Sequence, residues 1–244
     1  ALAPNLQGEL LREGLDAALA IREERARTSV LAAFALNLQG ELREKTLRAG
    51  LDTALAIQSE WARSIELAAL APILQGEMKE DALRAGLDAA FAIEYDSIRS
   101  SALAAFIPNL QGEMKEKTLR AGLDAALAIQ SEWARSNTLA DLAPNLQGEM
   151  LRTVLVTALA IQEERVRSRA LAALAPHLTD PIHLRQIRHQ IATDLYTAFR
   201  QSPRADLLNY LATPGLIAPP LFTPDEVAAV AEAIVDVTTK WRWV

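Results

Sequence analysis

The sequence contains no cysteine, and this absence excludes several kinds of chemistry. Disulfide bonds, thiolate nucleophiles and cysteine-based zinc sites all require that residue. Glycine is also scarce: nine of the ten glycines belong to a recurring pattern described below, which leaves only Gly215 for another use. A phosphate-binding glycine loop is therefore excluded. We expect no cofactor.

Basic residues are outnumbered by acidic ones, 25 to 31, which gives a net charge of −6 and a pI near 5.2. Because binding to a nucleic-acid backbone depends on clustered Lys and Arg, this balance argues against a nucleic-acid partner. The chain has no run of 18 apolar residues and does not begin with a secretion signal. We expect a soluble, cytoplasmic protein without membrane contact.

What the chain does contain is an internal repeat. A Leu-Gln-Gly motif ends at five glycines that are separated by 32, 36, 36 and 36 residues: Gly8, Gly40, Gly76, Gly112 and Gly148. A fixed period in this range is typical of solenoids, in which each repeat buries its apolar face against its neighbours. We number these repeats one (residues 9–40), two (41–76), three (77–112), four (113–148) and five (149–178).

Each repeat carries the apolar patterns of two helices. In repeat four, Leu119, Leu123 and Ala126 recur at three- and four-residue steps, and a second stripe starts after Ser131 and ends near Pro144. The short connections between the stripes indicate antiparallel helix pairs. The predicted fold class is all-α: an α-solenoid of two-helix repeats of about 36 residues, stacked in a right-handed array.

The domain prediction has two parts. Residues 1–178 hold the five repeats, preceded at residues 1–8 by the tail of a partial repeat, and residues 179–244 form a three-helix C-terminal cap. In the cap, Pro181 starts a helix, Thr223 and Glu226 form a capping box, and Trp241 and Trp243 close the chain.

Two features of the repeats leave their history open. Repeats one and five each lack four residues of the first helix, which is typical of capping repeats but also of an irregular duplication. Repeats two and four differ at only seven of 36 positions, as expected after a recent duplication or in a consensus-like engineered chain.

The recurrent Leu-Ala-x-Leu-Ala-Pro-x-Leu turn at 139–146 and 171–178, followed by a final apolar helix that ends in Trp241 and Trp243, carries a resemblance. It resembles the two-helix repeat regions, similar to tetratricopeptide and HEAT repeats, of large bacterial multidomain proteins. Those proteins resemble nucleotide-dependent signalling switches of the STAND type or carry caspase-like effector domains. The resemblance implies a sensor or protein-binding surface whose partner could be another domain of the same parent chain.

An arginine begins the second-helix stripe of every repeat: Arg27, Arg63, Arg99, Arg135 and Arg167. A charge on a buried stripe must find a partner, so we expect these arginines to be largely buried and bonded to an acid three residues earlier or to carbonyls at the end of a first helix. We interpret them as a structural ladder; a row of exposed anion-binding donors is the functional alternative. Glycines in the middle of the first helices, such as Gly50 and Gly86, predict the close approach of a neighbouring helix.

One position varies while its neighbours stay fixed, four residues after each isoleucine: Arg25, Trp61, Ser97, Trp133 and Arg165. Tryptophan and arginine often anchor interfaces, so these are the candidate partner-binding residues. The alternative is that the tryptophans fill a groove between second helices.

The three histidines, His177, His183 and His189, are six residues apart, whereas helical metal pairs need a spacing of three or four. No nucleophile motif accompanies them, and we expect neither a metal site nor an enzyme; an enzyme would have a deep pocket near these residues. The function expected is a protein- or peptide-binding scaffold or sensor module in a larger bacterial signalling protein. A nucleic-acid-binding repeat and a ligand-free structural or engineered scaffold are the alternatives.

Overall fold

The structure is a computed structural model that describes residues 8–201 and 204–240. Trp241, Trp243 and most of the expected partial repeat at residues 1–8 lie outside the described residues. Within the described residues there are thirteen α-helices, three short 3₁₀ turns and no strand, so the all-α class is confirmed. Among these helices, none combines the length and apolar character that crossing a membrane requires.

The chain divides into two compact units, an N-terminal unit of residues 1–125 and a C-terminal unit of residues 126–244. The division falls inside α7 (Gly112–Ala128), and not at residue 178, where the sequence changes character.

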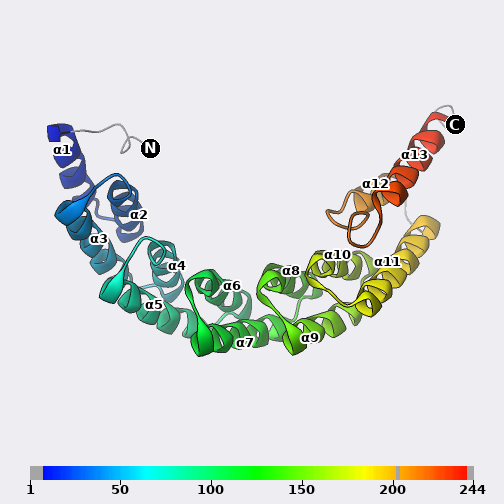
Figure 1. Ribbon diagram of the computed structural model, residues 1–244, viewed down its shortest axis with the longest axis horizontal. Coiled ribbons are helices and arrows are strands. Elements are labelled where there is room, and N and C mark those ends of the chain that lie inside the picture. Colours follow the sequence, from blue (N-terminus) through cyan, green and yellow to red (C-terminus); the bar gives the residue numbers. More distant parts are fainter. Residues whose placement is uncertain (1–7, 202–203, 241–244) are drawn as a thin grey trace. The chain divides into compact units, whose positions relative to one another are not determined.

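The N-terminal unit is built from antiparallel helix pairs in two layers (Figure 1): α1 (Gly8–Leu19), α2 (Glu24–Ala35), α3 (Gly40–Leu55), α4 (Glu60–Leu70), α5 (Gly76–Phe91), α6 (Asp96–Phe106) and the first part of α7. First helices pack against first helices and second against second, as α3 does with α5 and α2 with α4. A continuous apolar core, including Leu51, Leu67, Leu87, Leu103 and Phe106, runs between the layers.

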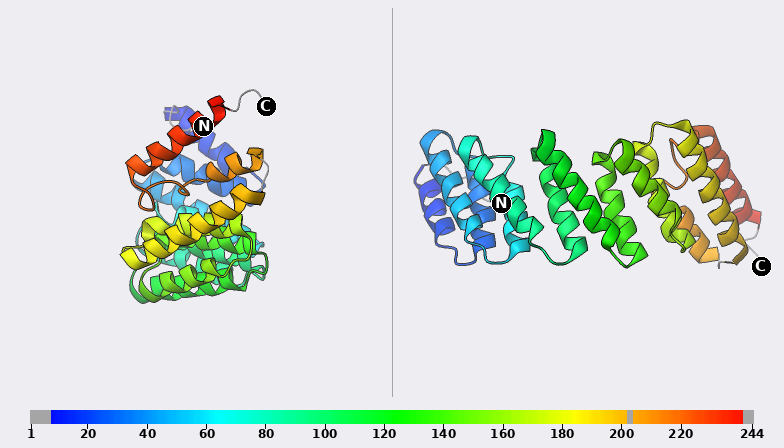
Figure 2. Two further views of the ribbon diagram at one scale, coloured as in Figure 1. Left: turned by 90° about the vertical axis from the view of Figure 1, so that its right-hand side faces the viewer. Right: turned by 90° about the horizontal axis from the view of Figure 1, so that it is seen from below.

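The C-terminal unit continues the pairing and then changes it (Figure 2): α8 (Glu132–Leu142), α9 (Gly148–Leu159), α10 (Glu164–Leu174), α11 (Pro181–Gln201), α12 (Arg204–Leu211) and α13 (Pro224–Lys240). Second helices α8 and α10 pack together, and α11 packs against α10. The predicted capping box forms, because Thr223 Oγ1 accepts from the Glu226 N–H at 3.3 Å and Glu226 Oε2 accepts from the Thr223 N–H at 2.9 Å.

The Leu-Gln-Gly motif has a backbone explanation. Gly40, Gly76, Gly112 and Gly148 begin first helices with φ between 53° and 56°, in the left-handed region that other L-residues rarely adopt. The leucine two positions earlier is buried in each case, for example Leu74 and Leu146. The motif therefore joins a core anchor to the turn that reverses the chain between repeats.

The mid-helix glycines differ from one another. A Cβ added at Gly86 would lie 2.4 Å from the ring of Phe106, whereas one added at Gly50 would meet Leu31 and Leu70 at 3.6 and 4.0 Å. The predicted close approach is therefore confirmed at Gly86 and is wrong at Gly50, because Leu70 stands where repeat three has the larger Phe106.

Candidate functional site

The arginines that begin the second-helix stripes bond to the loop of their own repeat. In each repeat the Nη1 atom donates to the carbonyl of the isoleucine six residues earlier, at distances of 2.9 Å for Arg27, 2.6 Å for Arg63 and 2.8 Å for Arg99 and Arg135. Arg167 makes the same bond to Ile161. Each guanidinium thus satisfies a carbonyl that follows the end of a first helix, where no intrahelical partner exists.

Other donors of these arginines have partners that differ from repeat to repeat, although the buried Nε of Arg135 has none among the described residues. Arg99 bonds to Asp96 and the Arg135 guanidinium lies 3.9 Å from Glu132, both three residues earlier. Arg27 Nε instead donates to Thr53 of repeat two at 3.2 Å, and Arg167 pairs with Asp194 of α11. The acidic residue three positions before each arginine is therefore one type of partner among several.

The expectation that the arginines are largely buried needs correction. All five are intermediate in exposure, and the exposed side-chain fractions of Arg99, Arg135 and Arg167 are 27%, 20% and 13%. A guanidinium that reaches a loop carbonyl at the edge of the helix pair keeps part of its surface in water while its stem packs on the stripe.

Arg167 belongs to a buried polar cluster between repeat five and the cap. Asp194, only 1% exposed, accepts from Arg167 Nε at 3.1 Å and from its Nη2, from Ser168 Oγ at 2.9 Å and from Gln190 Nε2 at 2.9 Å. Tyr210 Oη bonds to Ser168 Oγ at 2.6 Å. The bond to Asp194 raises the pKa of Arg167, and burial raises the pKa of Tyr210.

In the N-terminal unit, the candidate partner-binding residues Arg25, Trp61 and Ser97 are all exposed. The Arg25 guanidinium lies 5.2 Å from the centre of the Trp61 ring, and its Nε is 3.2 Å from Glu66 Oε1. Glu66, which is only 7% exposed, also accepts from Ser29 Oγ at 3.2 Å. The carboxylate thus holds Arg25 over a tryptophan that remains 45% exposed.

In the C-terminal unit, Trp133 and Arg165 are exposed as well. Trp133 is 58% exposed, and among the described residues no cation lies over its ring. The Arg165 guanidinium lies 5.8 Å from the Tyr210 ring centre and 4.0 Å from Asp206. Both tryptophans leave about half of their surface exposed, and neither is buried between second helices.

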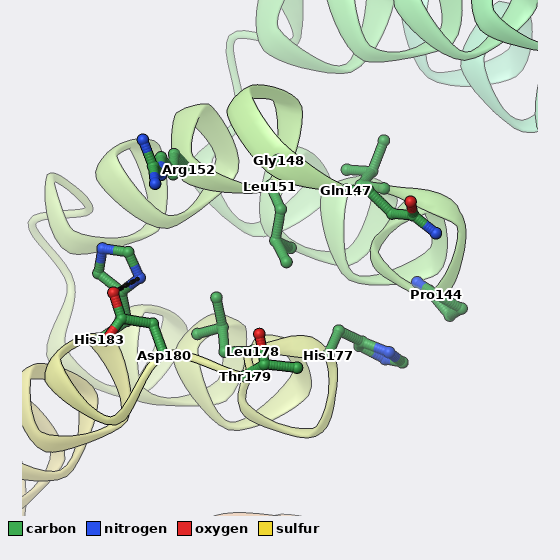
Figure 3. Close-up of a pocket in the computed structure, with 11 residues that line it drawn as sticks. Pro144, Gln147, Gly148, Leu151, Arg152, His177, Leu178, Thr179, Asp180 and His183 are labelled. Atoms are coloured by element: carbon green, nitrogen blue, oxygen red, sulfur yellow. Dashed lines mark ion pairs between the residues drawn. The ribbon is translucent and has the colours of Figure 1, made fainter.

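A pocket of about 460 Å³ lies in the C-terminal unit, between the loop that precedes α9 and the start of α11 (Figure 3). Arg152, His183 and Asp180 lie at one end, Pro144, Gln147 and His177 at the other, and Leu151 and Leu178 between them (Figure 3). Asp180 Oδ1 accepts from the Ile182 N–H at 2.8 Å, and its Oδ2 lies 3.5 Å from His183 Nδ1.

Two of the three histidines therefore line a pocket, as an enzyme would require. The pocket brings no catalytic nucleophile motif to them, since its one hydroxyl is that of Thr179. In the part of the chain that the structure describes, no group of three His, Asp or Glu side chains could hold a metal ion.

Sequence reasoning missed three residues that this geometry brings forward: Thr53, Glu66 and Asp194. Each partners an arginine of a preceding second helix. Thr53 and Glu66 are among the seven positions at which repeats two and four differ, where repeat four has Ala125 and Thr138. This difference between repeats two and four is the sequence signal that could have pointed to Thr53 and Glu66.

Comparison of the chain with protein-family models, curated proteins and solved structures finds no match. The fold and the surfaces described above define an all-α protein of paired helices that presents arginine and tryptophan side chains at the starts of its second helices.

Proposed function

We propose that the chain is an α-solenoid of 36-residue helix pairs that binds an extended protein segment. The observation that carries the proposal is the exposure of all five variable second-helix residues, Arg25, Trp61, Ser97, Trp133 and Arg165. Exposed tryptophan and arginine that the core does not need are the residue types that anchor protein interfaces.

The packing supports the solenoid part of the proposal. Within each compact unit, second helices contact second helices, so equivalent positions of successive repeats lie side by side on one surface. An extended peptide that crosses such helices meets one repeat after about three residues, since neighbouring helices are roughly 8 to 10 Å apart. Within one unit, each variable position can then contact a different part of the same peptide.

The resemblance to bacterial two-helix repeat regions gives the setting of the proposal. We infer from this resemblance that the chain is the sensor or scaffold part of a larger signalling or defence protein. In this proposal the chain performs no catalysis itself. A bound segment or a neighbouring domain of the parent chain would report on the state of the cell.

The test is selection of linear peptides from a random phage-displayed library on the intact chain, followed by measurement of their affinities. A variant with Trp61→Ala and Trp133→Ala should fold with unchanged stability and lose at least tenfold in affinity, because each removes a large aromatic contact. Tyr196→Ala, which removes an exposed aromatic ring from α11, is the matched control.

Two outcomes would reject the binding role. One is a double variant that is destabilised but binds the selected peptides as before. The other is a loss of affinity in Tyr196→Ala equal to that of the double variant.

A further inference from the structure

The pocket beside α11 has a counterpart in the N-terminal unit, and the two differ in chemistry. A groove of about 360 Å³ lies at the equivalent place between repeats two and three. Counted from the glycines that start α3 and α9, Glu44 of that groove corresponds to Arg152 of the pocket. Ile73 corresponds to His177 in the Leu-Ala-Pro-x-Leu segment near the end of each repeat. At this position the later pocket therefore has a basic side chain where the groove has an acidic one, while Arg43 of the groove corresponds to Leu151.

The basic end of the pocket has an available donor. Arg152 is exposed, and among the described residues its guanidinium has no ion-pair partner. The one carboxylate nearby, on Asp180, already accepts from the Ile182 N–H and faces His183 Nδ1. Arg152 and the imidazole of His183 lie at the same end (Figure 3), so an added anionic group would meet the guanidinium and a ring nitrogen there.

The middle of the pocket is apolar. Leu146, Leu151 and Leu178 line it and are themselves buried in the core. A pocket of this size, with leucines in its middle and polar groups at both ends, has room for a small ligand with a charged head and an apolar tail.

We propose that this pocket binds an aliphatic carboxylate, with the carboxylate between Arg152 and His183 and the aliphatic part over the three leucines. The site is independent of the exposed tryptophans and lies on the loops that join one repeat to the next. Two sources share this chemistry: a free short-chain carboxylic acid and the C-terminal aliphatic residue of a polypeptide.

The experiment measures binding of four probes to the intact chain by calorimetry and by amide NMR shifts. The probes are hexanoate, hexylamine, and acetyl-Ala-Ala-Leu with a free or an amidated C-terminus. Hexanoate or the free-terminus peptide should bind and shift amides around Gly148 and Thr179, but not those around Gly40 and Gln75. Binding of hexanoate identifies a free acid as a competent ligand, and binding of the peptide alone identifies a polypeptide terminus.

Arg152→Gln should weaken carboxylate binding about tenfold, because a charge-assisted hydrogen bond is lost. His183→Gln should weaken it by less. Glu44→Gln, in the equivalent groove, is the matched control and should leave it unchanged. Arg152 and Glu44 are exposed and His183 is partly exposed, so circular dichroism should show unaltered folding.

The proposal fails if no carboxylate binds, if hexylamine or the amidated peptide binds as tightly as its anionic counterpart, or if folded Arg152→Gln binds hexanoate with wild-type affinity. Each of these results would show that the exchange of Glu44 for Arg152 has no role in recognition.

Discussion

Two junctions, one in each compact unit, use the same chemistry with different results. In the N-terminal unit, Glu66 of repeat two accepts from Arg25 and Ser29 of repeat one. In the C-terminal unit, Asp194 of α11 accepts from Arg167 and Ser168 of repeat five. A carboxylate opposite an arginine and a serine therefore joins neighbouring elements at both places.

The difference lies in burial. Both carboxylates are buried, but their arginine partners differ: the Arg167 side chain is 13% exposed and the Arg25 side chain is 44% exposed. Asp194 also accepts from Gln190. Breaking a buried charge pair leaves the other charge without a partner in a poorly solvated place, while a partly exposed pair is replaced by water at little cost. The Asp194 junction therefore stabilises the fold, and the Glu66 junction positions the surface side chain of Arg25 over Trp61.

The largest effect is expected from Asp194→Ala, which should lower the free energy of unfolding by about 3 to 5 kcal/mol, because the Arg167 guanidinium loses its buried partner. Urea denaturation of the intact chain, followed by circular dichroism, measures the change. Asp206→Ala, whose carboxylate is half exposed beside Arg165, is the control and should change stability by less than about 0.5 kcal/mol. A loss below about 1 kcal/mol for Asp194→Ala would contradict the distinction between the two junctions.

A smaller effect is expected from Glu66→Thr, which installs the residue that repeat four carries as Thr138. The loss should be about 1 kcal/mol, because Arg25 can turn to solvent. The emission of Trp61 should also shift to longer wavelength, measured in a chain whose other tryptophans are replaced by phenylalanine, since the ring loses its stacked guanidinium. An unchanged spectrum, as expected for the exposed control Glu80→Thr, would show that Glu66 does not position Arg25.

The smallest effect concerns a third, partly exposed pair, formed by Arg188 of α11 and Glu226 of α13. Bonds from the Thr223 N–H and from Arg188 lower the pKa of Glu226 below its usual value of 4.5. A lowered pKa in the folded state means that the contribution of Glu226 to stability is present above pH 4.5 and is lost as the pH falls through the folded-state pKa. Carbon NMR titration of the carboxyl group should show this low value, and Arg188→Gln should raise it; equal values in the two chains would contradict the pairing.

Much of the fold could be predicted from repeated residues. The apolar spacing in repeat four predicted two helices, and the structure has α7 and α8 there. The capping box at Thr223 was readable because its geometry is local. The solenoid of 36-residue repeats stays a prediction, and it is the basis of the proposed function.

The partners of individual side chains could not be predicted in the same way. Thr53, Glu66 and Asp194 occupy positions that the repeat pattern does not share, so their contacts depend on which residue the preceding helix presents. The exposure of Trp61 and Trp133 depends on the tilt and spacing of helices, which periodicity does not give. The pocket beside α11 could not be predicted from the sequence, because Arg152 and His183 lie on separate helices that only the folded structure brings together.

The contact between Gly86 and Phe106 has a consequence for how such a chain can evolve. A Cβ at residue 86 would lie well inside the van der Waals distance of that ring, and both residues belong to repeat three. Repeat five has Val154 and Leu174 at the corresponding positions. A crossover in the loop between the two helices of a repeat would place a valine against a phenylalanine, and the product would be overpacked. An exchange that joins the first helix of repeat five to the second helix of repeat three is therefore expected to be disfavoured, whereas an exchange of whole helix pairs keeps Gly86 with Phe106.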